Sequence, residues 1–257
     1  MSNVERTEDP VLAVLPPRPF QFRLRHLLVA MAMICAMLAV LVPLFRMARQ
    51  RTQRMQSANN LKMISIALHN YHDVWNSFPP VYQCDTNGKP AHSWRMLITP
   101  FMEDAYPVYQ RYNFAEPWDG PNNSRLGALM PRNYRSPWVR AGTTQFTSYV
   151  AIVGPETMWP GERGIDIGRI VDGTSNTIMV VEISHSDIHW MEPRDLPFEE
   201  LEAWLDLKHK PRIGGDIQGG MVAMADGSVQ YLPREVTIEK LRGLATRSGR
   251  EYQHHLP

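Results

Sequence analysis

The sequence predicts an α+β protein in which a long N-terminal helix, partly membrane-spanning, packs on an antiparallel sheet. Three observations predict this class. Residues 27–45 form an uncharged apolar run of 19 residues, about the length a helix needs to cross a bilayer core. No glycine precedes Gly88, and Pro43 is the only proline between Phe22 and Phe78, which is typical of one long helix. Farther on, short β-branched and aromatic runs alternate with turns rich in Gly and Pro, a pattern that indicates strands.

The N-terminal part predicts an arm followed by an anchor. Residues 1–21 carry charges and several prolines without helical periodicity, so we expect a flexible arm. The apolar run at 27–45 is longer than the 7–15-residue core of a signal peptide. Phe-Arg-Met-Ala-Arg follows it, which is a poor small-residue cleavage site. We therefore expect an uncleaved, single-pass anchor rather than a removed signal.

Beyond the span, the helix predicted over residues 22–78 becomes amphipathic. Leu61, Ile64 and Leu68 recur at helical spacing, so one face is predicted to lie against a soluble domain. Two consecutive prolines after Phe78 end the helix. The remaining residues, 79–257, are numerous enough for one soluble α+β domain with its own core.

Within that domain, the pattern predicts short helices and short strands. One or two helices are expected within residues 93–112, interrupted by Pro100 and Pro107, and a closing helix is expected over residues 237–247.

The strands are predicted from β-branched and aromatic runs, at 148–153 and, most clearly, at 177–182. Two further runs, 221–225 and 228–232, flank Asp226-Gly227, which is a strong local hairpin signal.

The charge balance bears on partners and on topology. Lys and Arg number 27 against 26 Asp and Glu, a formal charge of +1, so no concentrated basic surface for nucleic acid is expected. The bilayer is the predicted partner, because arginines gather directly after the span and can contact lipid headgroups. Four arginines follow the span and three precede it. By the positive-inside rule, this excess favours placing the C-terminal side in the cytoplasm. The arginines are Arg46, Arg49, Arg51 and Arg54 after the span, and Arg18, Arg23 and Arg25 before it.

The two cysteines carry little information. Cys35 lies in the span and Cys84 lies beyond it, so neither a disulfide framework nor a zinc pattern is predicted.

Two histidine clusters are candidate metal sites. His185, Asp187 and His189 follow the clearest strand, and on an extended chain alternate residues face one side, so the three could converge. The alternative is a loop of solvated polar residues. His69 and His72 share a helix face near Asp73, and there the alternative is a favourable position near a helix C-terminus.

Other polar residues suggest weaker possibilities. Asp172 and Asp226 precede glycines in turns, where their side chains can accept backbone hydrogen bonds, and calcium would need more clustered oxygen atoms. Glu182 could act as a general acid or base if it is buried, although no partner is visible.

The segment Glu116 to Asn123 (EPWDGPNN) combines an aromatic ring with polar groups, so it is a candidate ligand surface. The tryptophans of the domain could also line a carbohydrate-type surface, while core packing is their commoner use: Trp94, Trp118, Trp138, Trp159 and Trp190.

An ordered set of segments resembles a bacterial family abundant in planctomycetes, domain of unknown function 1559. The resemblance covers roughly residues 22–249 and implies a long helix like that of type IV pilins and type II secretion pseudopilins, packed on an antiparallel sheet. It also implies a soluble part outside the cytoplasmic membrane, and no established activity. The segments are SANNLKMISIALHNYHDVWNSFPP, SWRMLITPFMED, YNFAEPWDGPNNSRL, TSYVAIVGP, IVDGTSNTIMVVE and GGMVAMADGSVQYL.

The chain departs from the family's pattern at its processing signal. Processed members have a glycine before the phenylalanine that starts the helix and an acidic residue five positions into the helix. Here Gln21 precedes Phe22, and His26 stands at the acidic position, while Pro43 matches a proline frequent in pilin-like helices. Many members also carry a histidine where this chain has Asp216. We therefore expect a pilin-shaped protein that keeps its N-terminus and stays anchored.

The arginine count and the resemblance disagree about the side of the membrane. Following the resemblance, we expect a single-pass protein of the cytoplasmic membrane, with its soluble domain outside, acting as a structural or interaction module. Serine nucleophile motifs, glycine-rich phosphate loops and the zinc-protease pattern are missing, so we expect neither an enzyme nor a cofactor. The alternatives are a minor pseudopilin, with other pilin-like envelope proteins as partners, and a metal-binding or hydrolytic envelope enzyme. No small-molecule ligand can be named from the sequence.

Overall fold

The computed structural model describes residues 24–139, 145–206, 212–215 and 218–249. The α+β class is confirmed, with a long apolar N-terminal helix, antiparallel strands and short helices. The chain divides into two compact units between Ala48 and Arg49. Gln21, Phe22 and Asp216, which the sequence singled out, lie outside the described residues.

Helix α1 (Leu24–Trp75) runs through Pro43 without interruption. Its first half contains an 18-residue apolar window of which no part is buried by the rest of the protein. Large side chains there stand in the open, with Leu27 57% and Phe45 71% exposed. This is the one helix in the described part of the chain that is long and apolar enough to cross a membrane. That property is consistent with membrane anchoring.

The second half of α1 belongs to the unit that contains the sheet. Leu61, Ile64 and Leu68 are fully buried there, as the amphipathic pattern predicted. Polar groups on the same part of the helix bond to the domain as well: Asn60 Nδ2 donates to the carbonyl of Arg135 at 2.9 Å. This half is therefore a structural part of the soluble domain.

The main sheet is antiparallel and is built around β5 (Ile178–Ser184), whose seven residues are all buried. Its order is β3 (Tyr149–Val150), β5, β8 (Gly219–Met224), β9 (Val229–Pro233), and β7 (Arg212–Ile213) pairs with β5 off this path. The predicted hairpin is confirmed as β8 and β9, with Gly227 at φ 76° in the turn between them.

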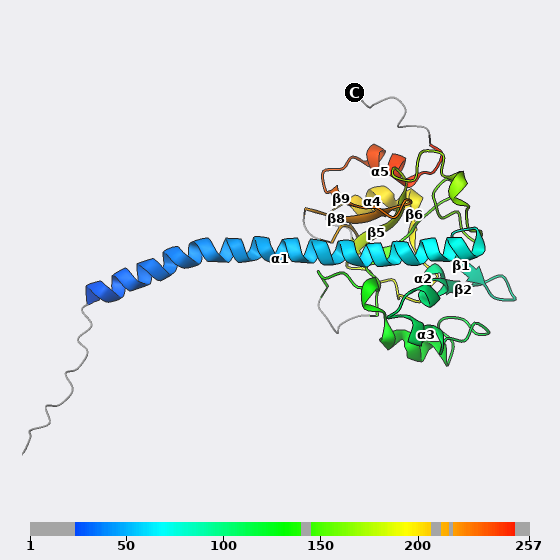
Figure 1. Cartoon of the computed structure of the whole chain (residues 1–257), viewed down its shortest axis with the longest axis horizontal. Helices are drawn as coiled ribbons and strands as arrows, with labels where there is room; N and C mark the ends of the chain where they lie inside the picture. Colours follow the sequence, from blue (N-terminus) through cyan, green and yellow to red (C-terminus); the bar gives the residue numbers. More distant parts are fainter. Residues whose placement is uncertain (1–23, 140–144, 207–211, 216–217, 250–257) are drawn as a thin grey trace, which may run out of the picture. The chain divides into compact units, whose positions relative to one another are not determined.

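Both faces of the sheet are covered. Along β8 the side chains alternate: Ala223 joins a core with Leu61 of α1, while Val222 joins a second core with Leu241 and Trp204. Within this unit the sheet therefore lies between the second half of α1 on one face and the helices α4 (Leu201–Leu205) and α5 (Ile238–Ala245) on the other (Figure 1).

The short helices lie where prolines and capping side chains in the sequence favour helix starts and ends. The region predicted as one or two helices contains α2 (Trp94–Leu97), a 3₁₀ turn at Thr99–Phe101 and α3 (Tyr106–Tyr109). Side chains of Ser93 and Thr237 cap α2 and α5. The remaining elements are the hairpin β1 (Tyr82–Cys84) and β2 (Pro90–Ser93), and the 3₁₀ helices η2 (Asn123–Leu129), η3 (Arg132–Tyr134), η4 (Ile167–Arg169) and η5 (Phe198–Glu200).

The strand predicted at 148–153 is split, which corrects that detail of the sequence interpretation. β3 ends at Val150, and β4 (Ile152–Val153) pairs in parallel with β6 (Leu196–Pro197). The break falls at Ala151, whose amide donates to the buried carboxylate of Asp195 at 2.7 Å rather than to a strand partner. A long-range polar contact, invisible in the local pattern, therefore redirects the chain.

Candidate functional site

A cavity with a volume of about 330 Å³ lies at the end of β5. Four stretches of chain meet there: the segment after η3, the residues just before β3, the end of β5 and the second residue after β7. We call it the Ser148 pocket, and its lining consists of Ser136, Trp138, Val139, Phe146, Thr147, Ser148, Ile183, Ser184, His185, Ser186 and Gly215. The lining is rich in hydroxyl groups and aromatic rings.

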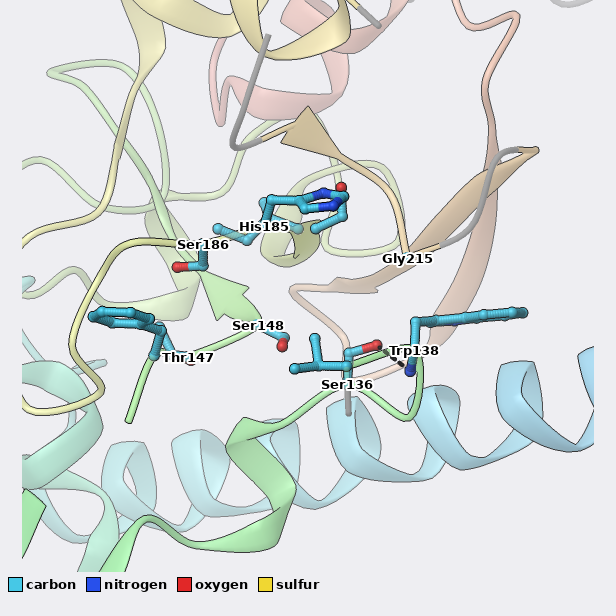
Figure 2. Close-up of a pocket in the computed structure, with 11 residues that line it drawn as sticks. Ser136, Trp138, Thr147, Ser148, His185, Ser186 and Gly215 are labelled. Atoms are coloured by element: carbon cyan, nitrogen blue, oxygen red, sulfur yellow. Dashed lines mark hydrogen bonds between the residues drawn. The ribbon is translucent and has the colours of Figure 1, made fainter. Parts of the chain in front are cut away.

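The end of β5 gives the pocket one of its walls. β5 stops at Ser184, and His185 adopts φ 56°, in the left-handed region that few residues other than glycine occupy. Figure 2 shows His185 and Ser186 on one side of the hollow, with Ser136 and Ser148 across from them. The turn of the backbone at His185 therefore brings an exposed imidazole to the rim of the cavity.

The same turn separates the residues predicted as the best metal cluster. Asp187 pairs with Arg194, at 3.3 Å between Oδ1 and Nη2. His189 Nε2 lies 3.0 Å from Gln145 Oε1, and its Nδ1 accepts from the Met191 amide at 3.2 Å. His185 contacts neither. Across the described ranges, no three His, Cys, Asp or Glu side chains are grouped so as to hold a metal ion. The chain leaves the extended conformation at His185, so of the two alternatives the loop, and not the extended strand, describes this segment.

The second histidine cluster is also used in packing. His72 Nε2 accepts from the amide of Ile167 at 3.3 Å, and its ring lies 4.7 Å from that of Phe78. The ring of His69 meets Phe78 from another side, at 5.4 Å. Burial lowers the pKa of His69, and the nearby His72 lowers it further. Both rings therefore support the end of α1.

Glu182 lies beneath the Ser148 pocket and is 1% exposed. Ser136 Oγ donates to its Oε1 at 2.6 Å, and the amide of Met221 donates to its Oε2 at 3.0 Å. A Cβ added at Gly215 would come within 2.5 Å of Glu182 Oε1 and 2.6 Å of Trp138 Cδ1. The carboxylate is thus locked in place by hydrogen bonds and close packing, and it holds Ser136 at the pocket wall.

Three polar groups on the pocket are not engaged by any residue that the structure describes. The hydroxyl of Ser148, the imidazole of His185 and the indole N–H of Trp138 have no hydrogen-bond partner among the residues with described positions. Ser148 is 2% exposed, and its backbone is fixed on both sides, by the carbonyl of Tyr134 and the amide of Ile183 at 2.8 Å each. Ser148 lines the cavity, so its hydroxyl is available to a bound molecule.

The EPWDGPNN loop (residues 116–123) satisfies its own polar groups. Glu116 Oε1 accepts from the amides of Asn122 and Asn123, at 2.9 and 2.7 Å. Asn123 is fully buried, and its Nδ2 donates to three carbonyls. Trp118 stacks on His189 with ring centroids 5.0 Å apart. The loop is therefore a rigid support for the His189 region, and its use as a ligand surface stays a prediction.

A buried ion pair escaped the sequence interpretation. Arg95 Nη2 lies 2.5 Å from Asp195 Oδ1, and both side chains are fully inaccessible. The carboxylate also accepts from the indole of Trp94 at 3.1 Å and from the amide of Ala151. Burial raises the pKa of Asp195 to about 6, and the Arg95 charge opposes that rise. No local signal marks this pair, because its members are 100 residues apart in the sequence.

A comparison with protein families gives one match. The model of the family described as Protein of unknown function (DUF1559) matches residues 46–204. No curated protein and no solved structure matches the chain. The matched range begins after the apolar segment, so the likeness of the N-terminal helix to pilins stays a prediction.

Proposed function

This chain belongs to the DUF1559 family, and from that premise we propose that it is a single-pass envelope protein that displays its soluble domain outside the cytoplasmic membrane. In this role it is a structural or interaction module without catalysis. The observation that carries the proposal is the contrast within α1, whose first half is exposed and apolar while its second half is buried in a folded domain. Exposed apolar surface of this extent is costly in water and favourable in lipid.

A basic cleft near the start of the domain supports the membrane-bound state. It is lined by Arg49, Arg132 and Arg135, and no acidic side chain lines it in the described part of the protein. Arg49 stands about one helical turn after Phe45, the end of the apolar run. Anionic lipid headgroups are attracted to such a cluster.

The site residues do not favour the two alternatives, a minor pseudopilin and a metal-binding or hydrolytic envelope enzyme. Assembly as a pseudopilin would use the processing glycine and the acidic residue, which are replaced by Gln21 and His26. A hydrolytic or metal enzyme would need a cluster that the His185, Asp187 and His189 geometry does not form. Display of a binding surface requires neither.

Cysteine labelling in intact cells tests the orientation. In a Cys35→Ser, Cys84→Ser background, we would introduce Asn87→Cys at an exposed turn of the soluble domain. A membrane-impermeant maleimide applied to spheroplasts should label it without lysis. The matched variant Ser2→Cys, on the other side of the span, should be labelled only after lysis. The reverse pattern would place the domain in the cytoplasm and overturn the proposal.

Intact-mass analysis of the protein from native membranes separates the anchor from the pilin route. An unprocessed N-terminus is expected. Cleavage before Phe22 with N-methylation would instead make filament assembly the leading hypothesis.

A further inference from the structure

The Ser148 pocket has the size of a small-molecule site. Its volume of about 330 Å³ falls at the lower end of the range for ligand pockets, which is about 300–1,000 Å³. Its walls come from the centre of the domain, because β5 and β3 are joined by the sheet and the segment at Ser136 is held by Glu182. A pocket built on such elements is largely preformed.

The unengaged polar groups define the polar part of the ligand. Ser148 offers a hydroxyl that can donate and accept, Trp138 offers an N–H donor, and His185 offers ring nitrogens. The left-handed backbone at His185 is the kind of local strain that gathers at ligand sites. A ligand with several hydroxyl groups could satisfy these donors and acceptors together.

The aromatic side chains define the apolar part of the ligand. Phe146 is 40% exposed, and Trp138, also on the lining, is half-buried. Aromatic rings bind apolar faces by burying area and by edge or face contacts. A pyranose ring presents C–H groups on its faces and hydroxyls around its edge, which matches this division.

The described lining residues carry no fixed charge, which favours a neutral ligand. Among the described residues, no Asp, Glu, Lys or Arg lines the pocket. The carboxylate of Glu182, which bonds to the lining residue Ser136, is buried and is occupied by Ser136 and the Met221 amide. A phosphorylated or carboxylated ligand would lose its hydration without a compensating partner.

We infer that the Ser148 pocket binds a neutral carbohydrate, of one or two sugar units, through the Ser148 hydroxyl and the Trp138 and Phe146 rings. This inference deepens the proposed function, because it names what the displayed domain binds. The binding chemistry itself does not depend on the side of the membrane on which the domain lies.

Titration calorimetry on the full chain in phosphatidylcholine nanodiscs tests the inference. The probes are neutral mono- and disaccharides of glucose, galactose, mannose, xylose and N-acetylglucosamine, with glucose 6-phosphate as the charged comparison. At least one neutral saccharide should bind saturably at millimolar concentration or below, and glucose 6-phosphate should not bind. Lack of saturable binding by every neutral saccharide would overturn the inference, as would equal binding of the phosphate.

Two pairs of variants locate the binding. Ser148→Ala should weaken it about tenfold, since it removes a hydrogen bond without adding bulk, and Trp138→Ala should weaken it at least as much. The matched controls are Ser228→Ala, which removes another unpartnered hydroxyl, and Trp75→Ala, which removes an exposed ring on α1. Both controls should bind like the wild type.

Near-UV circular dichroism checks that each variant is folded. Wild-type affinity in both folded Ser148→Ala and Trp138→Ala would place the ligand elsewhere and overturn the inference. The binding assay uses purified protein, and the labelling assay uses spheroplasts. Failure of the carbohydrate inference is therefore distinguishable from failure of the proposed orientation.

Discussion

Asp195 is the buried counter-charge of Arg95. Replacing it by alanine would leave the Arg95 guanidinium inaccessible to water and without its counter-charge. We expect Asp195→Ala to lower the free energy of unfolding by about 3–5 kcal/mol, measured by urea denaturation.

The control for this change is an exposed ion pair on the same strand-to-loop region. Asp187 pairs with Arg194 at the surface, where their side chains are 64% and 46% exposed. Asp187→Ala should cost about 1 kcal/mol or less. Equal losses in the two variants would contradict a special role for the buried pair.

His92 is expected to make stability depend on pH. Its side chain is 5% exposed, its Nδ1 lies 2.9 Å from the Tyr112 hydroxyl, and burial lowers its pKa below the ordinary value of about 6.5. The unfolded chain therefore takes up a proton at a higher pH than the folded one. The contribution of His92 is complete above about pH 6.5 and is lost as the pH falls below it.

Urea unfolding at several pH values between 7.5 and 5 measures this effect. His92→Gln should flatten the decline, by no more than about 1.4 kcal/mol per pH unit, the limit for one proton. The raised pKa of Asp195 acts in the opposite direction, since its contribution is lost as the pH rises toward about 6. That contribution is common to both proteins and cancels in the comparison. Identical slopes would show that His92 does not titrate differently on folding.

At the scale of elements, the second half of α1 is predicted to be indispensable to the domain. Leu61 is fully buried against the sheet, whereas Ile66 on the same helix is 41% exposed. Leu61→Ala should destabilise the domain by about 2–5 kcal/mol, because it leaves a cavity. Ile66→Ala should change the stability by about 0.5 kcal/mol or less. Thermal unfolding of the two variants measures this difference in stability. Equal midpoint temperatures would be incompatible with the packing of α1 against the sheet.

The elements also show what local sequence signals can determine. The long helix, the capped α5 and the hairpin around Asp226-Gly227 were predictable, because propensity, caps and turn residues agree within each segment. The split of the strand at 148–153 was not, because Ala151 is captured by Asp195 from a distant segment. The parallel pairing of β4 with β6 follows from that same contact.

The candidate site was predictable only in part, for a related reason. His185 and Trp138 were among the sequence candidates, and both line the Ser148 pocket. His185 was only a candidate for a metal cluster, which required an extended chain through His189, and the left-handed turn removes that condition. Ser148 carried no motif, because its significance lies in its place on the lining of a cavity formed by distant segments.

At the scale of the whole molecule, the division between Ala48 and Arg49 predicts where the protein can be cut. A variant that lacks residues 1–48 should leave the membrane fraction and unfold cooperatively, because the buried face of α1 remains with the sheet. A variant that lacks residues 1–78 should not fold, since it loses Leu61, Ile64 and Leu68. Fractionation and circular dichroism measure both outcomes, and a well-folded 79–257 fragment would contradict the role of α1.

The burial of α1 also determines an order of events during synthesis. Leu61 and Leu68 leave the ribosome early, whereas Val180 and Ala223, which share their core, follow more than a hundred residues later. Contacts so distant in sequence form slowly. Until the last strands have been made, the nascent chain therefore carries a second apolar face just beyond its apolar run. A cell that makes this protein must shield that face while the C-terminal third is still being translated.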